Sequence, residues 1–259
     1  MPQMSSTPLV VGVDSSGLQF KSITNLGSAE NYSTSYHFVA DGKSYLVTPV
    51  VDKDLKPLTF PRIQTNLGGI QDKEITKFIY RSNFQCYLVS KEMYCQGDNS
   101  RGQLGNGSIQ YSDVPLKVDA SGVLKGKDID DFVMGNGHAC VLSDGQVFCW
   151  GSNEAGQLGI SNEKDAFGAF KTKFVNQPVA VDTSGVLKGK KITDIEASNQ
   201  STCVVASNEI FCWGVLHSSF VDPKKPNETT VGTPQELRAK GELAGKSIMK
   251  VVMPPQLYS

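Results

Sequence analysis

The sequence is short of the features that mark several common classes of protein. Its 259 residues carry 25 Lys and Arg against 26 Asp and Glu, so no basic excess exists for general binding to nucleic acid. No apolar run approaches the roughly 18–20 residues of a membrane-spanning helix. The start, MPQMSSTPLVVGVD, lacks the basic residues and long apolar core of a secretory signal. The composition therefore predicts no nucleic-acid partner and no membrane insertion.

Patterns typical of catalysis or metal binding are also missing. The three histidines, His37, His138 and His217, belong to no HExxH motif and to no Ser–His–Asp spacing. The glycine-rich stretch GSNEAGQLG is not followed by the Lys-Ser/Thr pair of a phosphate-binding loop. No two cysteines stand at the close spacing of a zinc site. We therefore predict no enzyme activity, no catalytic residue, no metal and no cofactor.

What is present is a set of six cysteines in three equally spaced pairs. Eight residues separate the members of each pair: Cys86 and Cys95, Cys140 and Cys149, Cys203 and Cys212. Asp144-Gly145, midway in the second pair, is a preferred sequence for a two-residue type I′ hairpin turn. Such a turn places the two cysteines on a non-hydrogen-bonded pair with Cα atoms about 4.5 Å apart, which permits a disulfide. The spacing predicts three disulfides, with buried, reduced cysteines as the alternative.

The other two pairs place Ser207-Asn208 and Ser90-Lys91 at their turns. Ser90-Lys91 is a poor type I′ sequence, so a different loop is expected there. Disulfides persist in oxidising compartments, so the pairs predict an extracellular or cell-surface location for a processed or partial chain. A cytoplasmic location is the alternative.

A longer repeat runs through the whole chain. VDASGVLKGKDIDDFVM (118–134) matches VDTSGVLKGKKITDIEA (181–197), and weaker copies stand at 240–253 and 13–27, each after a proline. The hairpin HFVADGKSYL keeps the register, with His37 and Leu46 at the cysteine positions. The predicted units of one domain, 1–259, are 8–57, 58–114, 115–177, 178–233 and an incomplete 234–259. Each unit reads as a proline-led strand, a glycine turn, an alternating strand and a hairpin, which predicts an all-β propeller or propeller arc of four-stranded antiparallel blades.

Two of the repeats carry a recognisable signature. CWGSNEAGQLG (149–159) and CQGDNSRGQLGNG (95–107), with Gln96 in place of Trp150, resemble the repeat of the regulator of chromosome condensation family. A third copy, CWGVLHSSF, lacks the GQLG part. The resemblance implies a propeller, usually of seven blades, whereas four full units and the opening of a fifth are present here. We expect a fragment of a longer protein, with a closed smaller ring or blades supplied by a partner as alternatives.

Within that fold, several residues are candidates for packing or binding. Trp150 and Trp213 share a repeat position typical of inter-blade packing, and His138 is expected to pack or hydrogen-bond at a blade edge. The third unit has nine surplus residues around 161–178, and insertions in repeat proteins often form binding loops. The candidate partner-binding residues are therefore Phe167, Phe170, Lys171 and Phe174. The candidate glycosylation sites, each in an N-x-[ST] sequence, are Asn31, Asn106, Asn199 and Asn227.

Together these features predict a non-enzymatic, extracellular or cell-surface module that binds protein partners or neighbouring subunits, or serves as a structural element. The family also contains a nucleotide-exchange factor for the small GTPase Ran. The alternative function is therefore an intracellular scaffold or small-GTPase exchange factor. Secreted family members with hairpin cysteines look closer.

Overall fold

The protein is built almost entirely of short antiparallel strands. A computed structural model describes the backbone of the strand segments within 23–63, and describes residues 67–81, 83–161, 163–216, 229–237 and 248–250 in full. Within these ranges the one helical element is a 3-10 turn, η1 (Gly68–Ile70). No helix there is long and apolar enough to span a bilayer.

The strands form four sheets of four strands each, and every sheet is a meander in chain order. The first contains β1 (Ile23–Ser28), β2 (Tyr36–Ala40), β3 (Lys43–Val47) and β6 (Pro61–Ile63). The second contains β7 (Ile75–Arg81), β8 (Phe84–Val89), β9 (Glu92–Gly97) and β10 (Ser112–Lys117). The third contains β11 (Asp131–Met134), β12 (His138–Ser143), β13 (Gln146–Ser152) and β14 (Phe174–Ala180). The fourth contains β15 (Ile192–Ser198), β16 (Ser201–Ala206), β17 (Glu209–Val215) and β18 (Thr230–Leu237), and β4 (Val50–Val51) and β5 (Pro57–Leu58) pair separately.

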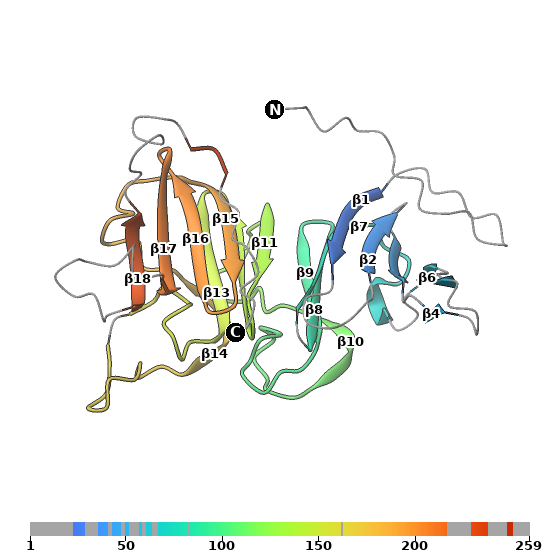
Figure 1. The fold of residues 1–259 in the computed structure, drawn as a ribbon, viewed down its shortest axis with the longest axis horizontal. Helices are drawn as coiled ribbons and strands as arrows, with labels where there is room; N and C mark the ends of the chain where they lie inside the picture. The colour runs from blue at the N-terminus through green and yellow to red at the C-terminus, as the bar shows by residue number, and fades with distance from the viewer. Residues whose placement is uncertain are drawn as a thin grey trace.

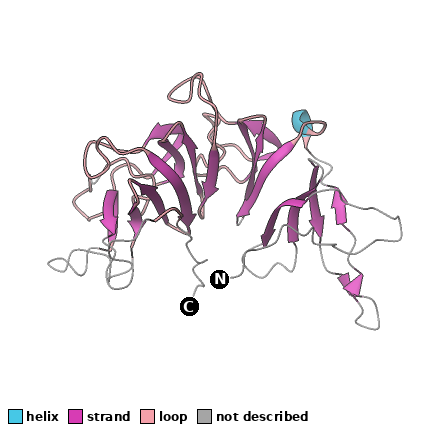
Figure 2. Ribbon diagram, turned by 90° about the horizontal axis from the view of Figure 1, so that it is seen from above, coloured by secondary structure: helices cyan, strands magenta, loops and turns pink. Residues whose placement is uncertain are grey.

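The four sheets are arranged as neighbouring blades of a propeller. The first strands of successive sheets lie against each other, β1 against β7, β7 against β11, and β11 against β15. Seen from above, the sheets stand side by side along an arc (Figure 2). Figure 1 shows the strands of the fourth sheet, β15 to β18, standing upright side by side in chain order. This arrangement confirms the predicted all-β propeller arc of four-stranded blades.

The hairpin register predicted from cysteine spacing is confirmed in all three cysteine-bearing sheets. Cys86 pairs with Cys95, Cys140 with Cys149 and Cys203 with Cys212 across adjacent strands. Each pair forms a disulfide with a Cα–Cα distance of 4.1 Å, shorter than the expected spacing. In the first sheet His37 faces Leu46, so the same hairpin forms without cysteines. The disulfide is thus an addition to a hairpin that the fold itself supplies.

The expectation of a different loop at Ser90-Lys91 is wrong. Val89 pairs with Glu92, which leaves only these two residues for the turn. Ser90 and Lys91 both have positive φ, 49° and 68°, as a type I′ turn requires. The twist of the flanking strands favours this turn and outweighs the cost of about 1–2 kcal/mol that a side chain incurs at each left-handed position.

The sequence repeat and the structural blade are out of phase. The prolines taken as the start of a unit lie in the outermost strand of the preceding sheet: Pro61 in β6, Pro115 in β10, Pro178 in β14 and Pro234 in β18. The predicted boundary at 114/115 therefore falls inside β10. The proline-led strand is the last strand of one blade and not the first of the next. An outermost strand suits proline because the missing N–H is needed least at a sheet edge.

The core lies between the sheets. One cluster joins Cys86 and Cys95 of the second blade to Phe132 and Trp150 of the third, and a second cluster repeats the arrangement between the third and fourth blades. In each, the disulfide of one blade packs among the aromatic and aliphatic side chains of the next. The hydrophobic core is therefore formed by side chains packed between neighbouring blades, and not within single sheets alone.

Candidate protein-contact site

Each GQLG loop is a structured clasp that closes over the following blade. In the third repeat, Asn153 Oδ1 accepts the N–H of Leu158 at 3.0 Å, and Gln157 Oε1 accepts the N–H of Ala155 at 2.9 Å. Asn99 and Gln103 make the equivalent bonds in the second repeat. The prediction that Asn and Gln side chains cap backbone groups in these loops is confirmed.

Each of these loops covers the tryptophan of the next blade. Trp150 Nε1 donates to the carbonyl oxygen of Gln103 at 2.9 Å, and Trp213 Nε1 donates to that of Gln157 at 2.8 Å. Both indoles are fully buried. A Cβ on Gly159, where φ is +70°, would lie 2.7 Å from Trp213 Nε1, so only glycine permits the close approach. The predicted inter-blade packing of the tryptophans is confirmed.

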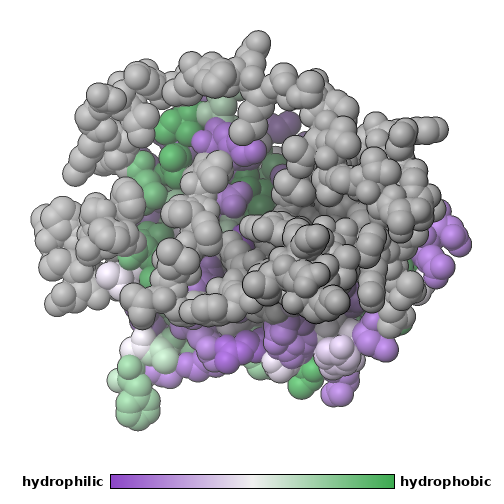
Figure 3. Space-filling model, turned by 45° about the vertical axis from the view of Figure 1, so that its right-hand side comes forward, coloured by the Kyte–Doolittle hydropathy of each residue, from purple (hydrophilic) through white to green (hydrophobic). Residues whose placement is uncertain are grey.

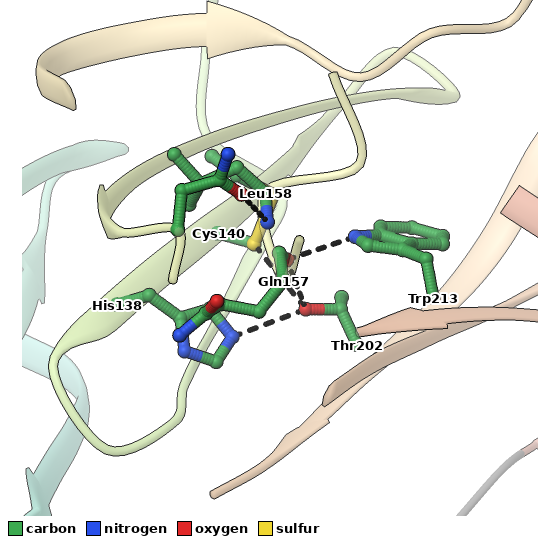
Figure 4. The surroundings of a disulfide bond; sticks show 8 residues. His138, Cys140, Gln157, Leu158, Thr202 and Trp213 are labelled. Carbon is green, nitrogen blue, oxygen red and sulfur yellow. Dashed lines mark hydrogen bonds between the residues drawn. A yellow bond between two sulfur atoms is a disulfide. The ribbon is translucent and has the colours of Figure 1, made fainter. Parts of the chain in front are cut away.

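His138 contributes a buried polar contact to the joint between the third and fourth blades. Figure 4 shows His138, Gln157, Thr202 and Trp213 converging beside the Cys140–Cys149 disulfide. The Thr202 hydroxyl donates to the carbonyl oxygen of Gln157 at 3.0 Å, so its oxygen accepts from His138 Nε2 at 3.1 Å. His138 is therefore the Nε2–H tautomer, and its Nδ1 has no hydrogen-bond partner in the described part of the chain.

The surplus residues of the third repeat form a braced hairpin at the edge of the fourth blade. Lys164 and Phe170 form a β-bridge, and Asp165 Oδ1 accepts the N–H groups of Phe167 and Ala169 at 2.9 and 3.0 Å. Backbone hydrogen bonds from Ala169 and then Phe167 lower the pKa of Asp165. Lys171 pairs with Glu163 at 3.2 Å. This excursion, residues 163–171, is called the insertion hairpin below.

The two phenylalanines of the insertion hairpin have opposite environments. Phe170 is only 2% exposed and lies against Gly156 and Gly232, while Lys164 Nζ stands 4.9 Å from its ring centroid. Phe167 is 96% exposed. Phe170 therefore anchors the hairpin to the neighbouring blade, and Phe167 is presented at its tip.

The family model of the regulator of chromosome condensation (RCC1) repeat matches residues 92–142 and 144–205, and a second model of this repeat matches 129–157. Residues 92–205, a little under half of the chain, therefore carry RCC1-like repeats. The matched segments contain both GQLG loops and Trp150, whereas Trp213 lies eight residues beyond the end of the second segment. The fold and the sequence signature therefore agree on the same structural unit.

Relatives of this RCC1-like chain are longer proteins. It is 24% identical over 192 residues to the human E3 ubiquitin-protein ligase HERC2, covering 72% of this chain and 3% of HERC2. It is 32% identical over 101 residues to the Xenopus laevis Protein RCC2 homolog, covering 39% of this chain and 19% of the relative. The chain thus spans a small part of the length of these curated relatives.

Solved structures show the same fold. Yeast RCC1 (Prp20), solved bound to Kap60, superposes with a TM-score of 0.61 at 17% identity, over 84% of this chain and 49% of Prp20. Human WBSCR16 superposes with a TM-score of 0.58 at 18% identity, over 78% of this chain and 49% of that one. The RCC1-like chain spans about half the length of either.

The structure divides the four candidate contact residues of this RCC1-like chain. The prediction that Phe170 is a contact residue is wrong, because its side chain is buried against the fourth blade. Phe167 and Phe174 are exposed, at 96% and 43%, and Lys171 is exposed beside Glu163. Sequence spacing locates the insertion but not the direction of its side chains. Ile109 and Tyr111, which sequence reasoning missed, are also exposed apolar residues.

Of the four candidate glycosylation sites, Asn31 and Asn227 lie outside the described residues, as do His37 and His217 as side chains. Asn106 is partly buried, and its Oδ1 accepts the N–H of Ser108 at 3.1 Å just after the GQLG loop of the second repeat. Asn199 lies in the turn between β15 and β16, and its carbonyl oxygen accepts from Asn136. Glycosylation at all four stays a prediction.

The innermost strands of the RCC1-like blades carry charges of both signs. Lys77 on β7 pairs with Asp131 on β11 at 2.6 Å. Glu196 on β15 is partly buried, and desolvation raises its pKa although Lys77 and Arg81 oppose the shift. No group of His, Cys, Asp and Glu in the described ranges is placed to hold a metal ion.

We predict that acid weakens the joint around His138. Burial, reinforced by Arg81, lowers the pKa of His138 from 6.5 to about 3. Between these two pH values His138 is protonated in the unfolded chain but neutral in the folded chain. The free energy of unfolding therefore falls as the pH drops from 6.5 toward 3. At pH 5 the loss is about 2 kcal/mol. Urea unfolding measured from pH 7 to pH 4 tests this.

The control is His138→Gln, which can still donate to Thr202 but does not titrate. Its unfolding free energy is expected to fall less steeply than that of the wild type between pH 6.5 and pH 4. Identical slopes for the two proteins contradict the assignment. The other titrating groups are common to both proteins, so the difference isolates His138.

Proposed function

We propose that the chain is a non-enzymatic protein-binding module of an extracellular or cell-surface protein. The observation that carries the binding role is the insertion hairpin, which holds Phe167 almost completely exposed on a braced support. Exposing an aromatic ring to water is unfavourable, and aromatic side chains are frequent energetic anchors of protein interfaces. A hairpin that is already ordered also reduces the conformational entropy lost on binding.

The proposed location is supported by the three disulfides. No cysteine in the chain is left unpaired, and each pair stands across a hairpin of a different blade. Cytosolic thiols are kept reduced, whereas disulfides of this kind persist in oxidising compartments. Counting thiols of the protein isolated from its source, in denaturant without reductant, tests the location. No free thiol is expected, and six free thiols would favour the intracellular scaffold or exchange factor.

The binding role is tested by photocrosslinking from the hairpin tip. A chain carrying a benzophenone amino acid at position 167 is applied to intact source cells and to their medium, then irradiated. The matched control carries the same amino acid at Val186, which is also exposed and apolar but lies in the turn that follows the other end of β14. A discrete protein adduct formed from position 167 and not from position 186 is expected. Equal adducts from both positions contradict the proposal.

A further inference from the structure

A second group of exposed apolar side chains follows the GQLG loop of the preceding repeat. Tyr111 is 70% exposed and Ile109 is 47% exposed, although both sit in a short loop leading into β10. Neither side chain belongs to an apolar core cluster in the described part of the chain. Two large apolar residues exposed side by side in a loop have no structural explanation within the blade.

This loop lies along β14, the strand that follows the insertion hairpin. Gly107 N–H donates to the carbonyl oxygen of Asn176 at 2.8 Å, and Asn176 Nδ2 donates back to the carbonyl oxygen of Gly107 at 2.8 Å. In the next repeat, Ser161 N–H makes the equivalent bond to Gly232 at 3.0 Å. Each loop therefore runs beside the outermost strand of the following blade. Gly107, which precedes Ile109 and Tyr111, thus lies beside Asn176 of β14, two residues from the exposed Phe174.

The two loops project from the same side of the molecule. Figure 1 shows the green loop before β10 and the yellow loop before β14 both extending below the blades. In the space-filling view, apolar side chains protrude among polar ones along that lower side (Figure 3). The exposed apolar residues on these two loops and on the start of β14 are Ile109, Tyr111, Phe167 and Phe174. They are called the lower apolar rim below.

The charges around the lower apolar rim narrow the class of partner. Three nearby cations are paired with a carboxylate: Arg101 with Glu154 at 2.5 Å, Lys171 with Glu163 at 3.2 Å and Lys173 with Asp165 at 3.8 Å. A fourth, Lys164, donates to the carbonyl oxygen of Thr230 at 3.4 Å and lies over the ring of Phe170. A surface neutralised in this way offers little attraction to phosphate groups of nucleic acid or of an anionic membrane. An apolar protein segment without a net charge requirement matches it better.

We propose that the lower apolar rim is one contact surface, spanning two blades, for a protein segment that carries apolar side chains. Ile109 and Tyr111 come from the loop before β10, Phe167 from the tip of the insertion hairpin and Phe174 from the start of β14. This inference rests on the proposed function and extends it from the hairpin tip to the neighbouring repeat. Because the contact is apolar, binding is expected to change little between low and high salt.

The test uses a phage-displayed library of random peptides as the probe. Peptides are selected on the wild-type chain and their affinities are then measured for three variants: Ile109→Ser with Tyr111→Ser, Phe167→Ser, and Val186→Ser as the control. All replaced side chains are exposed, so the melting temperatures are expected to stay together. The first two variants are expected to lose about tenfold or more in affinity, and the control none.

The outcomes separate the inference from the proposed function. Loss of binding in Phe167→Ser alone overturns the two-blade surface and leaves the hairpin contact standing. Undiminished binding in both rim variants overturns both, and so does a selection that enriches no peptide. Vesicles of 30% phosphatidylserine and 70% phosphatidylcholine form a second arm. Binding of the wild type to these vesicles that is lost in the Ile109→Ser, Tyr111→Ser variant identifies a lipid surface instead and overturns the protein segment.

Discussion

Replacing Trp213 with alanine is expected to lower the free energy of unfolding by about 3–5 kcal/mol. The indole is fully buried in the joint between the third and fourth blades, where it packs with Leu158 of the preceding GQLG loop. Its removal leaves a cavity and also frees the loop that caps it, because the hydrogen bond to Gln157 is lost. Urea unfolding monitored by circular dichroism measures the change, and a loss below about 1 kcal/mol contradicts the role of the clasp.

A matched pair of phenylalanine variants separates the hydrogen bond from the packing. Among the described bonds, the carbonyl oxygen of Gln103 accepts only from Trp150, whereas that of Gln157 accepts from both Trp213 and Thr202. Trp150→Phe therefore leaves a buried carbonyl without a donor, and Trp213→Phe does not. We expect Trp150→Phe to be more destabilising by about 1 kcal/mol or more. Equal losses would show that the N–H groups contribute little.

The fold could be predicted from sequence wherever local rules fix the backbone. Asp144-Gly145 specifies a tight turn, and the turn then fixes which residues face each other out to Cys140 and Cys149. The Ser90-Lys91 turn was predicted wrongly because local preference was judged without the register imposed by its sheet. The phase of the blade was not visible either. A repeat has no intrinsic starting point, and strand pairing alone assigns β10, β14 and β18 to the preceding sheets.

The contacts between the GQLG loops and the tryptophans could not be predicted from local sequence, because they join residues far apart in the chain. Gln103 and Trp150 are 47 residues apart, and Gln157 and Trp213 are 56 apart. A signal was nevertheless present. Gln96 replaces tryptophan in the second blade, and the repeat before it has no GQLG loop, while Trp150 and Trp213 each follow a repeat that has one. The co-occurrence matches the contact, since the indole needs the loop that caps it.

The length of the third repeat located the candidate contact site, but the sequence did not show which of its side chains are exposed. Nine surplus residues indicate an insertion, but the sequence alone does not distinguish the environments of Phe167 and Phe170. Their difference comes from the β-bridge at Phe170 and the missing side chain at Gly232, which opens space for the ring at the edge of the fourth blade. Such a tertiary contact has no local signature.

Replacing Cys140 and Cys149 together with alanine is expected to lower the free energy of unfolding by about 3 kcal/mol from loop closure alone. All three disulfides close loops of the same size, with a sequence separation of 9, so this part of the loss is shared. Their surroundings differ. Cys140 and Cys149 pack against the fourth blade, whereas Cys203 and Cys212 cluster with Leu216, Ile210, Val231 and Leu237 around their own sheet.

The Cys203→Ala, Cys212→Ala variant is therefore the matched control. Its loss is expected to approach the loop-closure value, and the Cys140→Ala, Cys149→Ala variant is expected to lose about 1 kcal/mol more because alanine leaves a gap in the joint between blades. Unfolding in urea without reductant compares the two. Equal losses would show that the sulfur atoms stiffen hairpins without joining blades. A loss in both variants well under 1 kcal/mol would mean that the hairpins are held as firmly without their disulfides, as the first sheet already holds His37 opposite Leu46.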